Sequence, residues 1–133
     1  MNFADDRYQR ALSLILELGY LCAFSGSTRD QAIALLTAHK AARPDSRGHL
    51  VGEAIIHLCC DAEPEEAVSV IRQAGFDYRE ANEEPLVTAF WAFILMHAGY
   101  NFEASGVINY LLDNSDDTEA LQLARSVQQE MLG

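Results

Sequence analysis

One pattern recurs three times along the chain and limits what it can fold into. The segments QAIALL, EAVSVI and EASGVI each place a long polar residue before an alanine, followed two residues later by a pair of aliphatic residues. The alanines are Ala32, Ala67 and Ala104, and they are separated by 35 and 37 residues. These separations are close to the roughly 34-residue period of helix-turn-helix repeats. The pattern therefore predicts three successive helix pairs.

The spacing of apolar residues elsewhere favours an all-α fold. Apolar residues recur every three to four positions, and no alternating β-branched run extends over six residues. Turn-forming residues divide the chain into seven segments that fit seven helices. The dividing clusters are 25–28, 42–46, 62–64, 77–85, 98–101 and 113–117. The seventh segment is predicted to cover the open end of the stack.

Several residues predict where individual helices begin and end. Pro64 and Pro85 suit the first turn of a helix, where no backbone donor is needed. Thr28 and Asp116 are predicted N-caps, whose side-chain oxygens accept backbone N–H groups. A glycine after an apolar run favours a left-handed residue that ends a helix. Such glycines are Gly26, Gly75 and Gly99.

Composition narrows the class of partner and the compartment. The 133 residues suit one domain, and 20 acidic against 9 basic side chains give a formal net charge of −11. This charge disfavours nucleic acid and favours neutral or basic partners. The apolar run 11–24 contains Glu17 and is too short to span a membrane, so no membrane insertion is expected. Three cysteines and no secretion signal predict a cytoplasmic protein.

The first pair resembles a tetratricopeptide repeat. Leu18 and Gly19 match the Leu-Gly pair of its first helix, and Ala32 matches the small residue of its second helix. Leu36 matches the large apolar residue four positions later, and Pro44 matches the proline that closes the repeat. The second and third units keep the alanine and the aliphatic pair but lack the proline, and the third has Trp-Ala where Leu-Gly is usual.

The resemblance implies a right-handed stack of three degenerate tetratricopeptide-like hairpins. The units cover about 8–44, 46–82 and 84–116, and a capping helix covers 117–132. With its small size and acidity, the chain is similar to the tetratricopeptide-like chaperones of bacterial type III secretion systems, of the kind that holds the needle subunit. That family implies a helical protein client, in many cases a small co-chaperone, and no catalysis.

Alignment with the tetratricopeptide repeat predicts which residues face a partner, because the first helix of each pair lines the concave surface of tetratricopeptide stacks. The predicted groove residues are mostly apolar: Leu16, Tyr20, Ala23, Gly52, Ile56, Cys59, Ala89, Phe93 and Met96. A groove of this kind suits an amphipathic client helix. Two alternatives remain open: the set packs against the seventh helix, or the protein is a generic adaptor or homodimer unrelated to secretion.

The segment HLCCDAEPEE, residues 57–66, has the composition of a metal site. In the repeat frame it is instead the end of one helix and the start of the next. Adjacent cysteines on a helix point about 100° apart, and His57 with Cys60 supplies only two of the four ligands of a closed zinc site. We therefore predict no metal, no cofactor and no catalytic residue. A small metal-dependent hydrolase built on His57, Cys60 and Asp61 is the alternative from the enzyme class.

Overall fold

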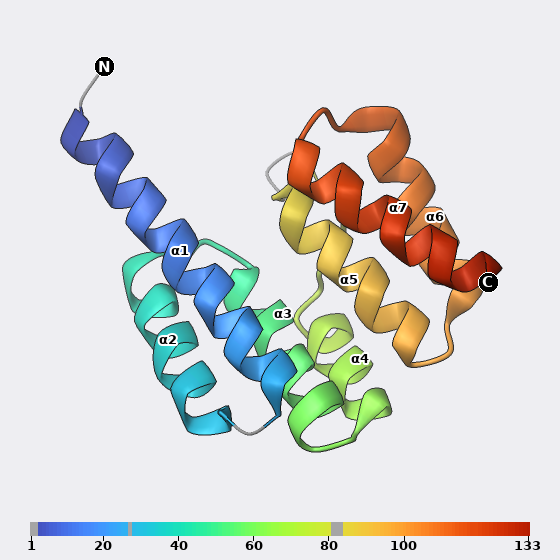
Figure 1. Cartoon of the computed structure of the whole chain (residues 1–133), viewed down its shortest axis with the longest axis horizontal. Helices are drawn as coiled ribbons and strands as arrows, with labels where there is room; N and C mark the ends of the chain where they lie inside the picture. Colours follow the sequence, from blue (N-terminus) through green and yellow to red (C-terminus); the bar gives the residue numbers. More distant parts are fainter. Residues whose placement is uncertain (1–2, 27, 81–83) are drawn as a thin grey trace.

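The computed structural model describes residues 3–26, 28–80 and 84–133, with residues 3–6 described by their backbone only. Every regular element in these ranges is a helix (Figure 1). The α-helices are α1 (Phe3–Ser25), α2 (Arg29–Ala42), α3 (Gly48–Ile55), α4 (Pro64–Gln73), α5 (Pro85–His97), α6 (Asn101–Asn114) and α7 (Thr118–Leu132). A short π-helix, η1 (Ile56–Cys60), continues α3. The prediction of an all-α chain with seven helices is confirmed for the described residues.

Helices that follow each other along the chain pack as pairs. α1 packs on α2, α3 on α4, and α5 on α6. The first helix of each later pair also contacts both helices of the pair before it, so that α3 contacts α1 and α2, and α5 contacts α3 and α4. α7 extends this order by contacting α5 and α6 (Figure 1). The handedness of the stack and its tetratricopeptide character stay predictions, and the predicted end of the second unit at residue 82 lies outside the described residues.

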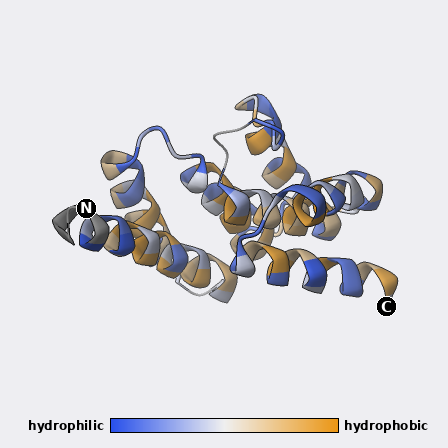
Figure 2. Ribbon diagram, turned by 90° about the horizontal axis from the view of Figure 1, so that it is seen from above, coloured by the Kyte–Doolittle hydropathy of each residue, from blue (hydrophilic) through white to orange (hydrophobic). Residues whose placement is uncertain are grey.

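The core lies between the helices and explains the repeated alanines. Ala32, Ala67 and Ala104 are completely buried on the second helices of the three pairs. A small side chain at these positions lets each second helix approach its neighbours closely. Figure 2 shows hydrophobic and hydrophilic residues on different sides of individual helices, as packing around a shared core requires.

Glycines on α1 and α3 allow three helices to meet around one leucine. A Cβ atom added to Gly52 of α3 would lie 2.5 Å from Leu36 Cδ2, and one added to Gly19 of α1 would lie 3.0 Å from the same atom. One turn before Gly52, a Cβ on Gly48 would lie 2.7 Å from Leu16 Cδ2. Leu36 of α2 is therefore held between α1 and α3 at a distance that only glycine permits.

The helix ends confirm the proline and glycine predictions. Pro64 and Pro85 are the first residues of α4 and α5. Three glycines have positive φ angles next to helix ends, as a left-handed C-terminal residue requires. They are Gly26 at +73°, Gly75 at +72° and Gly99 at +93°.

One predicted N-cap is wrong by one residue, and the other has the predicted position without the predicted bond. The N-cap of α7 is Asp117 rather than Asp116, and its carboxylate accepts a hydrogen bond of 2.9 Å from the backbone N–H of Ala120. Thr28 is the N-cap residue of α2, as predicted, but its side chain makes no capping hydrogen bond. Its hydroxyl instead donates to the carbonyl oxygen of Cys22 at 2.7 Å. This bond joins the start of α2 to the end of α1. Thr28 therefore bonds to the preceding helix and not to a backbone N–H of its own helix.

Two histidines make the stability of the fold depend on pH. Burial lowers the pKa of His39, while the carboxylate of Glu84 acts in the opposite direction. Burial and the neighbouring Lys40 lower the pKa of His49. The unfolded chain therefore binds more protons than the folded chain below about pH 6.5. The stabilisation is complete above about pH 6.5 and is lost as the pH falls toward the lowered folded-state values.

We expect the free energy of unfolding to decrease between pH 7.5 and pH 5.5, and His39→Leu to flatten that decrease. A single histidine contributes at most about 1.4 kcal/mol per pH unit, and the substitution removes the His39 share. Urea unfolding of both proteins at a series of pH values measures the slope. A variant that keeps the full wild-type slope would contradict the assignment to His39.

Candidate functional site

The structure does not bring the nine predicted groove residues together in one open groove. Six of them are buried inside the chain: Leu16, Tyr20, Ala23, Gly52, Ile56 and Ala89. The other three, Cys59, Phe93 and Met96, are partly buried. The reason is that each later helix pair packs on the first helix of the pair before it, so that α3 covers part of α1, and α5 and α7 meet closely. Ala23 and Ala89 are completely enclosed by the chain's own helices, whereas Leu16, Tyr20 and Ile56 reach the linings of separate hollows.

An apolar stripe instead runs along the exposed side of α1. Leu14, Leu18 and Leu21 are 58%, 50% and 63% exposed, and their spacing of four and three residues places them on one side of the helix. Beside Leu21, a hollow of about 400 Å³ opens between α1, α5 and α7. Its apolar lining includes Phe24, Leu86, Phe90 and Leu123. We call the three leucines and these four residues the α1–α5–α7 face.

Aromatic contacts fix the floor of this face. The ring of Phe90 lies 4.7 Å from that of Tyr20 and 5.9 Å from that of Phe24, measured between centroids. Phe24 also meets Phe93 edge to face at 5.2 Å. Aromatic pairs at these separations are attractive beyond their buried area. Tyr20 is further held by its hydroxyl, which donates to the carbonyl oxygen of Gly48 at 2.9 Å.

Carboxylates line the hollows of the α1–α5–α7 face. Glu17 and Glu119 line the hollow between the three helices. A neighbouring hollow of about 280 Å³ adds Glu84 and Asp117, and a third, of about 520 Å³ between α5 and α7, adds Glu130. Among the described residues, the linings of these three hollows contain acids but neither lysine nor arginine. The face therefore has an acidic rim on the side of α5 and α7, whereas Arg10 lies one turn before Leu14 on α1.

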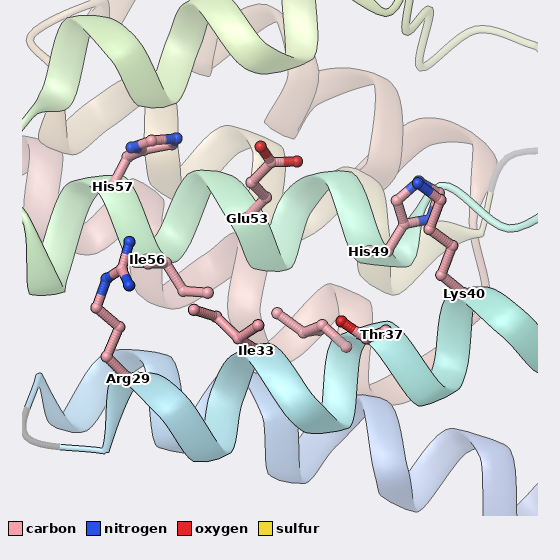
Figure 3. A pocket seen from close by; sticks show the side chains of 9 residues that line it. Arg29, Ile33, Thr37, Lys40, His49, Glu53, Ile56 and His57 are labelled. Carbon is pink, nitrogen blue, oxygen red and sulfur yellow. The ribbon is translucent and has the colours of Figure 1, made fainter.

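A second cleft, of about 310 Å³, lies between α2 and the helix formed by α3 and η1 (Figure 3). Ile33, Leu36 and Ile56 form its apolar part. Its polar residues are Arg29, Thr37, Lys40, His49, Glu53 and His57. Lys40 is the only lysine of the sequence, so this cleft differs in charge from the α1–α5–α7 face. Arg29 is engaged by Asp61, whose Oδ1 lies 3.2 Å from its Nε.

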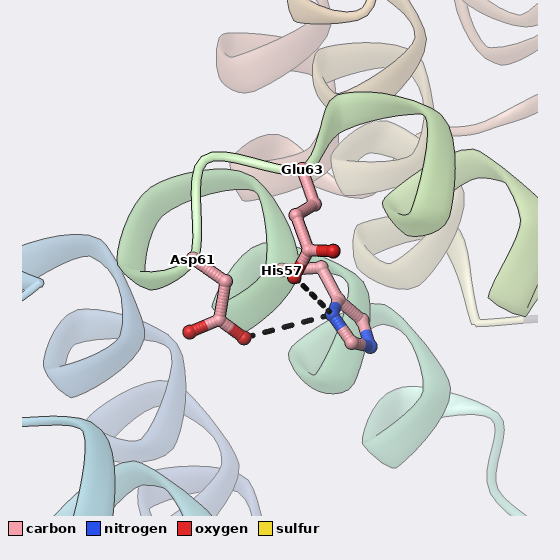
Figure 4. Close-up of side chains that lie close together, drawn as sticks. All are labelled: His57, Asp61 and Glu63. Carbon is pink, nitrogen blue, oxygen red and sulfur yellow. Dashed lines mark ion pairs between the residues drawn. The ribbon is translucent and has the colours of Figure 1, made fainter.

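At the end of η1, a histidine and two carboxylates come together (Figure 4). His57 Nδ1 lies 3.7 Å from Asp61 Oδ2 and 4.0 Å from Glu63 Oε1. Cys60, which the enzyme alternative placed beside His57 and Asp61, is engaged elsewhere, because its thiol donates to the carbonyl oxygen of Ala23 at 3.3 Å. Burial also raises the pKa of Cys60, which keeps the thiol protonated. The third residue beside His57 and Asp61 is therefore Glu63 and not Cys60.

Comparison with protein-family models, with curated proteins and with solved structures gives no match for this chain. None of the described helices is both long and apolar enough to cross a bilayer.

Proposed function

We propose that the protein binds an amphipathic helix of a partner protein on the α1–α5–α7 face. The observation that carries this proposal is the exposure of Leu14, Leu18 and Leu21 on one side of α1, where Leu21 borders the aromatic hollow. Covering a leucine side chain completely is worth about 1.5–3 kcal/mol, so this stripe is unfavourable in water and favourable under a partner. Contiguous exposed apolar patches commonly mark interaction sites.

The acidic rim indicates the chemistry of the partner. A helix that inserts apolar side chains at spacings of three and four residues would lie along the leucine stripe. Lysine or arginine on either side of its apolar face would then approach Glu17 and Glu119. The same rim disfavours pairing of two copies through this face, because like-charged carboxylates would meet across the interface. A basic amphipathic helix therefore fits better than a homodimer.

The more specific form of this proposal is a cytoplasmic chaperone of type III secretion. It is supported by the resemblance of residues 8–44 to a tetratricopeptide repeat and by the acidity of the chain. In this role the protein would cover the amphipathic helix of a secreted subunit and so keep it monomeric until export, with or without a co-chaperone. An adaptor unrelated to secretion would use the same face for a different helical client.

We expect the double variant Leu18→Glu/Leu21→Glu to bind a partner helix at least about a hundredfold more weakly than wild type. Each leucine would otherwise be buried at the centre of the interface, where truncation of an anchor costs about 2 kcal/mol or more. Both side chains are half or more exposed in the free protein, so the fold should be retained. Circular dichroism and thermal melting check this point.

Two defined peptides make the measurement independent of an unknown client. Both are amphipathic helices with the same apolar face, one flanked by lysine and the other by glutamate. Fluorescence titration should show at least tenfold tighter binding of the lysine-flanked peptide to wild type. Ile33→Glu is the matched control, because Ile33 is an exposed apolar residue of α2 outside the face. Unchanged binding by the double variant would contradict the proposal, and a wild-type dimer that the double variant dissociates would favour the homodimer.

A further inference from the structure

The turn from η1 to α4 places three metal-ligating atoms around one point. These atoms are Nδ1 of His57, a carboxylate oxygen of Asp61 and a carboxylate oxygen of Glu63, and all lie within 4.8 Å of one another. We propose that they bind a divalent transition-metal ion such as Zn²⁺. The site shares no residue with the α1–α5–α7 face, so the two proposals stand or fall separately.

The separations fit a shared ion better than direct hydrogen bonds. His57 Nδ1 is 3.7 Å from Asp61 Oδ2 and 4.0 Å from Glu63 Oε1, whereas an N–H···O hydrogen bond spans about 2.7–3.2 Å. Nitrogen and oxygen ligands at about 2.0–2.2 Å from a tetrahedral zinc ion lie about 3.4 Å apart. Small side-chain rotations would therefore close the three atoms onto one ion.

The environment of His57 Nδ1 also suits a bound cation. This nitrogen is shielded from solvent and has no hydrogen-bond partner among the described residues. A nitrogen lone pair at this position faces two negative carboxylates, which is unfavourable, and either a proton or a metal ion on Nδ1 removes this repulsion. A bound metal ion would satisfy the lone pair and both carboxylates together.

The backbone holds the three residues in place. The N–H of Asp61 donates to the carbonyl oxygen of Ile56 at 3.1 Å, and the N–H of Glu63 donates to that of His57 at 2.8 Å. Between them, Ala62 has a φ of +54°, which is uncommon for a residue with a side chain. This left-handed residue turns Glu63 back toward the histidine.

Arg29 completes the arrangement as a positioning residue. Its Nε binds Oδ1 of Asp61 at 3.2 Å, which leaves Oδ2 directed at the histidine. Outer partners of this kind orient the ligands of metal sites. One imidazole nitrogen and two carboxylate oxygens favour zinc and its neighbours in the first transition row over calcium and magnesium, which prefer all-oxygen sites. Three protein ligands leave a fourth position for water.

Metal-free protein titrated with Zn²⁺ against a chromophoric chelator tests the site. We expect wild type to bind one equivalent and Glu63→Gln to bind at least about tenfold more weakly, since even an outer-shell change costs that much. Glu63 is 57% exposed, so its substitution should not disturb the fold. Two controls should bind as wild type does: Cys60→Ser, and His97→Gln, which removes an exposed histidine 4.0 Å from Glu130.

Thermal melting and cobalt substitution give independent readouts. Zinc at about a hundredfold excess over the wild-type dissociation constant should raise the melting temperature of wild type by about 10 °C and that of Glu63→Gln by no more than about half as much. The Co²⁺ protein should show d–d absorption without a thiolate charge-transfer band. No zinc binding to wild type at millimolar concentration, equal binding by Glu63→Gln, or loss of binding in Cys60→Ser would each overturn the proposal.

Discussion

Gly52→Val should destabilise the protein by about 3 kcal/mol, at the upper end of the cost of overpacking a core. A Cβ atom at residue 52 would lie 2.5 Å from Leu36 Cδ2 and 2.6 Å from Leu36 Cδ1, and valine adds two more methyl groups. Leu36 can move only toward the cleft between α2 and α3, because Gly19 of α1 meets it from the other side. The gain in helix propensity over glycine, below about 1 kcal/mol, does not offset this clash. Urea unfolding measures the loss.

Gly106→Val is the matched control for this experiment. Gly106 lies within α6, and the nearest atom to an added Cβ is the hydroxyl oxygen of Tyr78 at 3.9 Å, which is an ordinary contact. The same substitution there should change the free energy of unfolding by no more than about 0.5 kcal/mol. Equal stabilities for the two variants would show that α2 and α3 do not meet as closely as described.

Leu95→Ala should destabilise the protein by about 2–5 kcal/mol, the range for removing a large aliphatic side chain from a core. Leu95 is completely buried on α5, the helix that contacts α3, α4, α6 and α7. Truncation would leave a cavity that five packed helices cannot easily fill. Unfolding can be followed by the fluorescence of Trp91, the only tryptophan, which is buried one turn earlier on the same helix.

Leu14→Ala applies the same change to an exposed residue of the α1–α5–α7 face. We expect a loss of no more than about 0.5 kcal/mol, because Leu14 is 58% exposed. This contrast separates residues that hold the fold from residues that are free to hold a partner. A large loss in Leu14→Ala would mean that the stripe is covered in solution, by the chain itself or by a second copy.

The helices could be predicted because their signals are local. Proline at the first turn, glycine at the last and an alanine in each second helix are properties of short segments, and they remain correct whatever the segment packs against. The predictions for the two N-caps failed in part because the sequence rules for helix starts allow more than one outcome at each. Asp116 and Asp117 are chemically identical, and only the path of the backbone decides which one meets the N–H of Ala120. The hydroxyl of Thr28 donates instead to a carbonyl group at the end of α1.

The surface residues were harder to predict because exposure depends on how closely successive pairs approach. The alignment with the repeat predicted that Leu16 and Gly52 line an open groove. The close contacts of Gly48 with Leu16 and of Gly52 with Leu36 bury both residues instead. Leu14, Leu18 and Leu21 carried a readable signal in their spacing. It was hidden within the mostly apolar run 11–24, in which Ser13 and Glu17 alone do not define a polar face.

Glu63 was missed as a partner of His57 for a different reason. Helical periodicity brings together residues three or four positions apart, whereas these two are six apart. Their approach depends on a π-turn and on the left-handed conformation of Ala62. Alanine gives no sequence signal for that conformation, in contrast to glycine.

The packing of each helix on its neighbours in sequence has a consequence for synthesis. Chains dominated by short-range contacts need little search to fold, and their elements can assemble in the order in which they leave the ribosome. Here α1 to α4 can pack together while the rest of the chain is still being made. The most apolar helix, α5, then emerges next to a surface that is ready to receive it. This order shortens the time in which its side chains are open to aggregation.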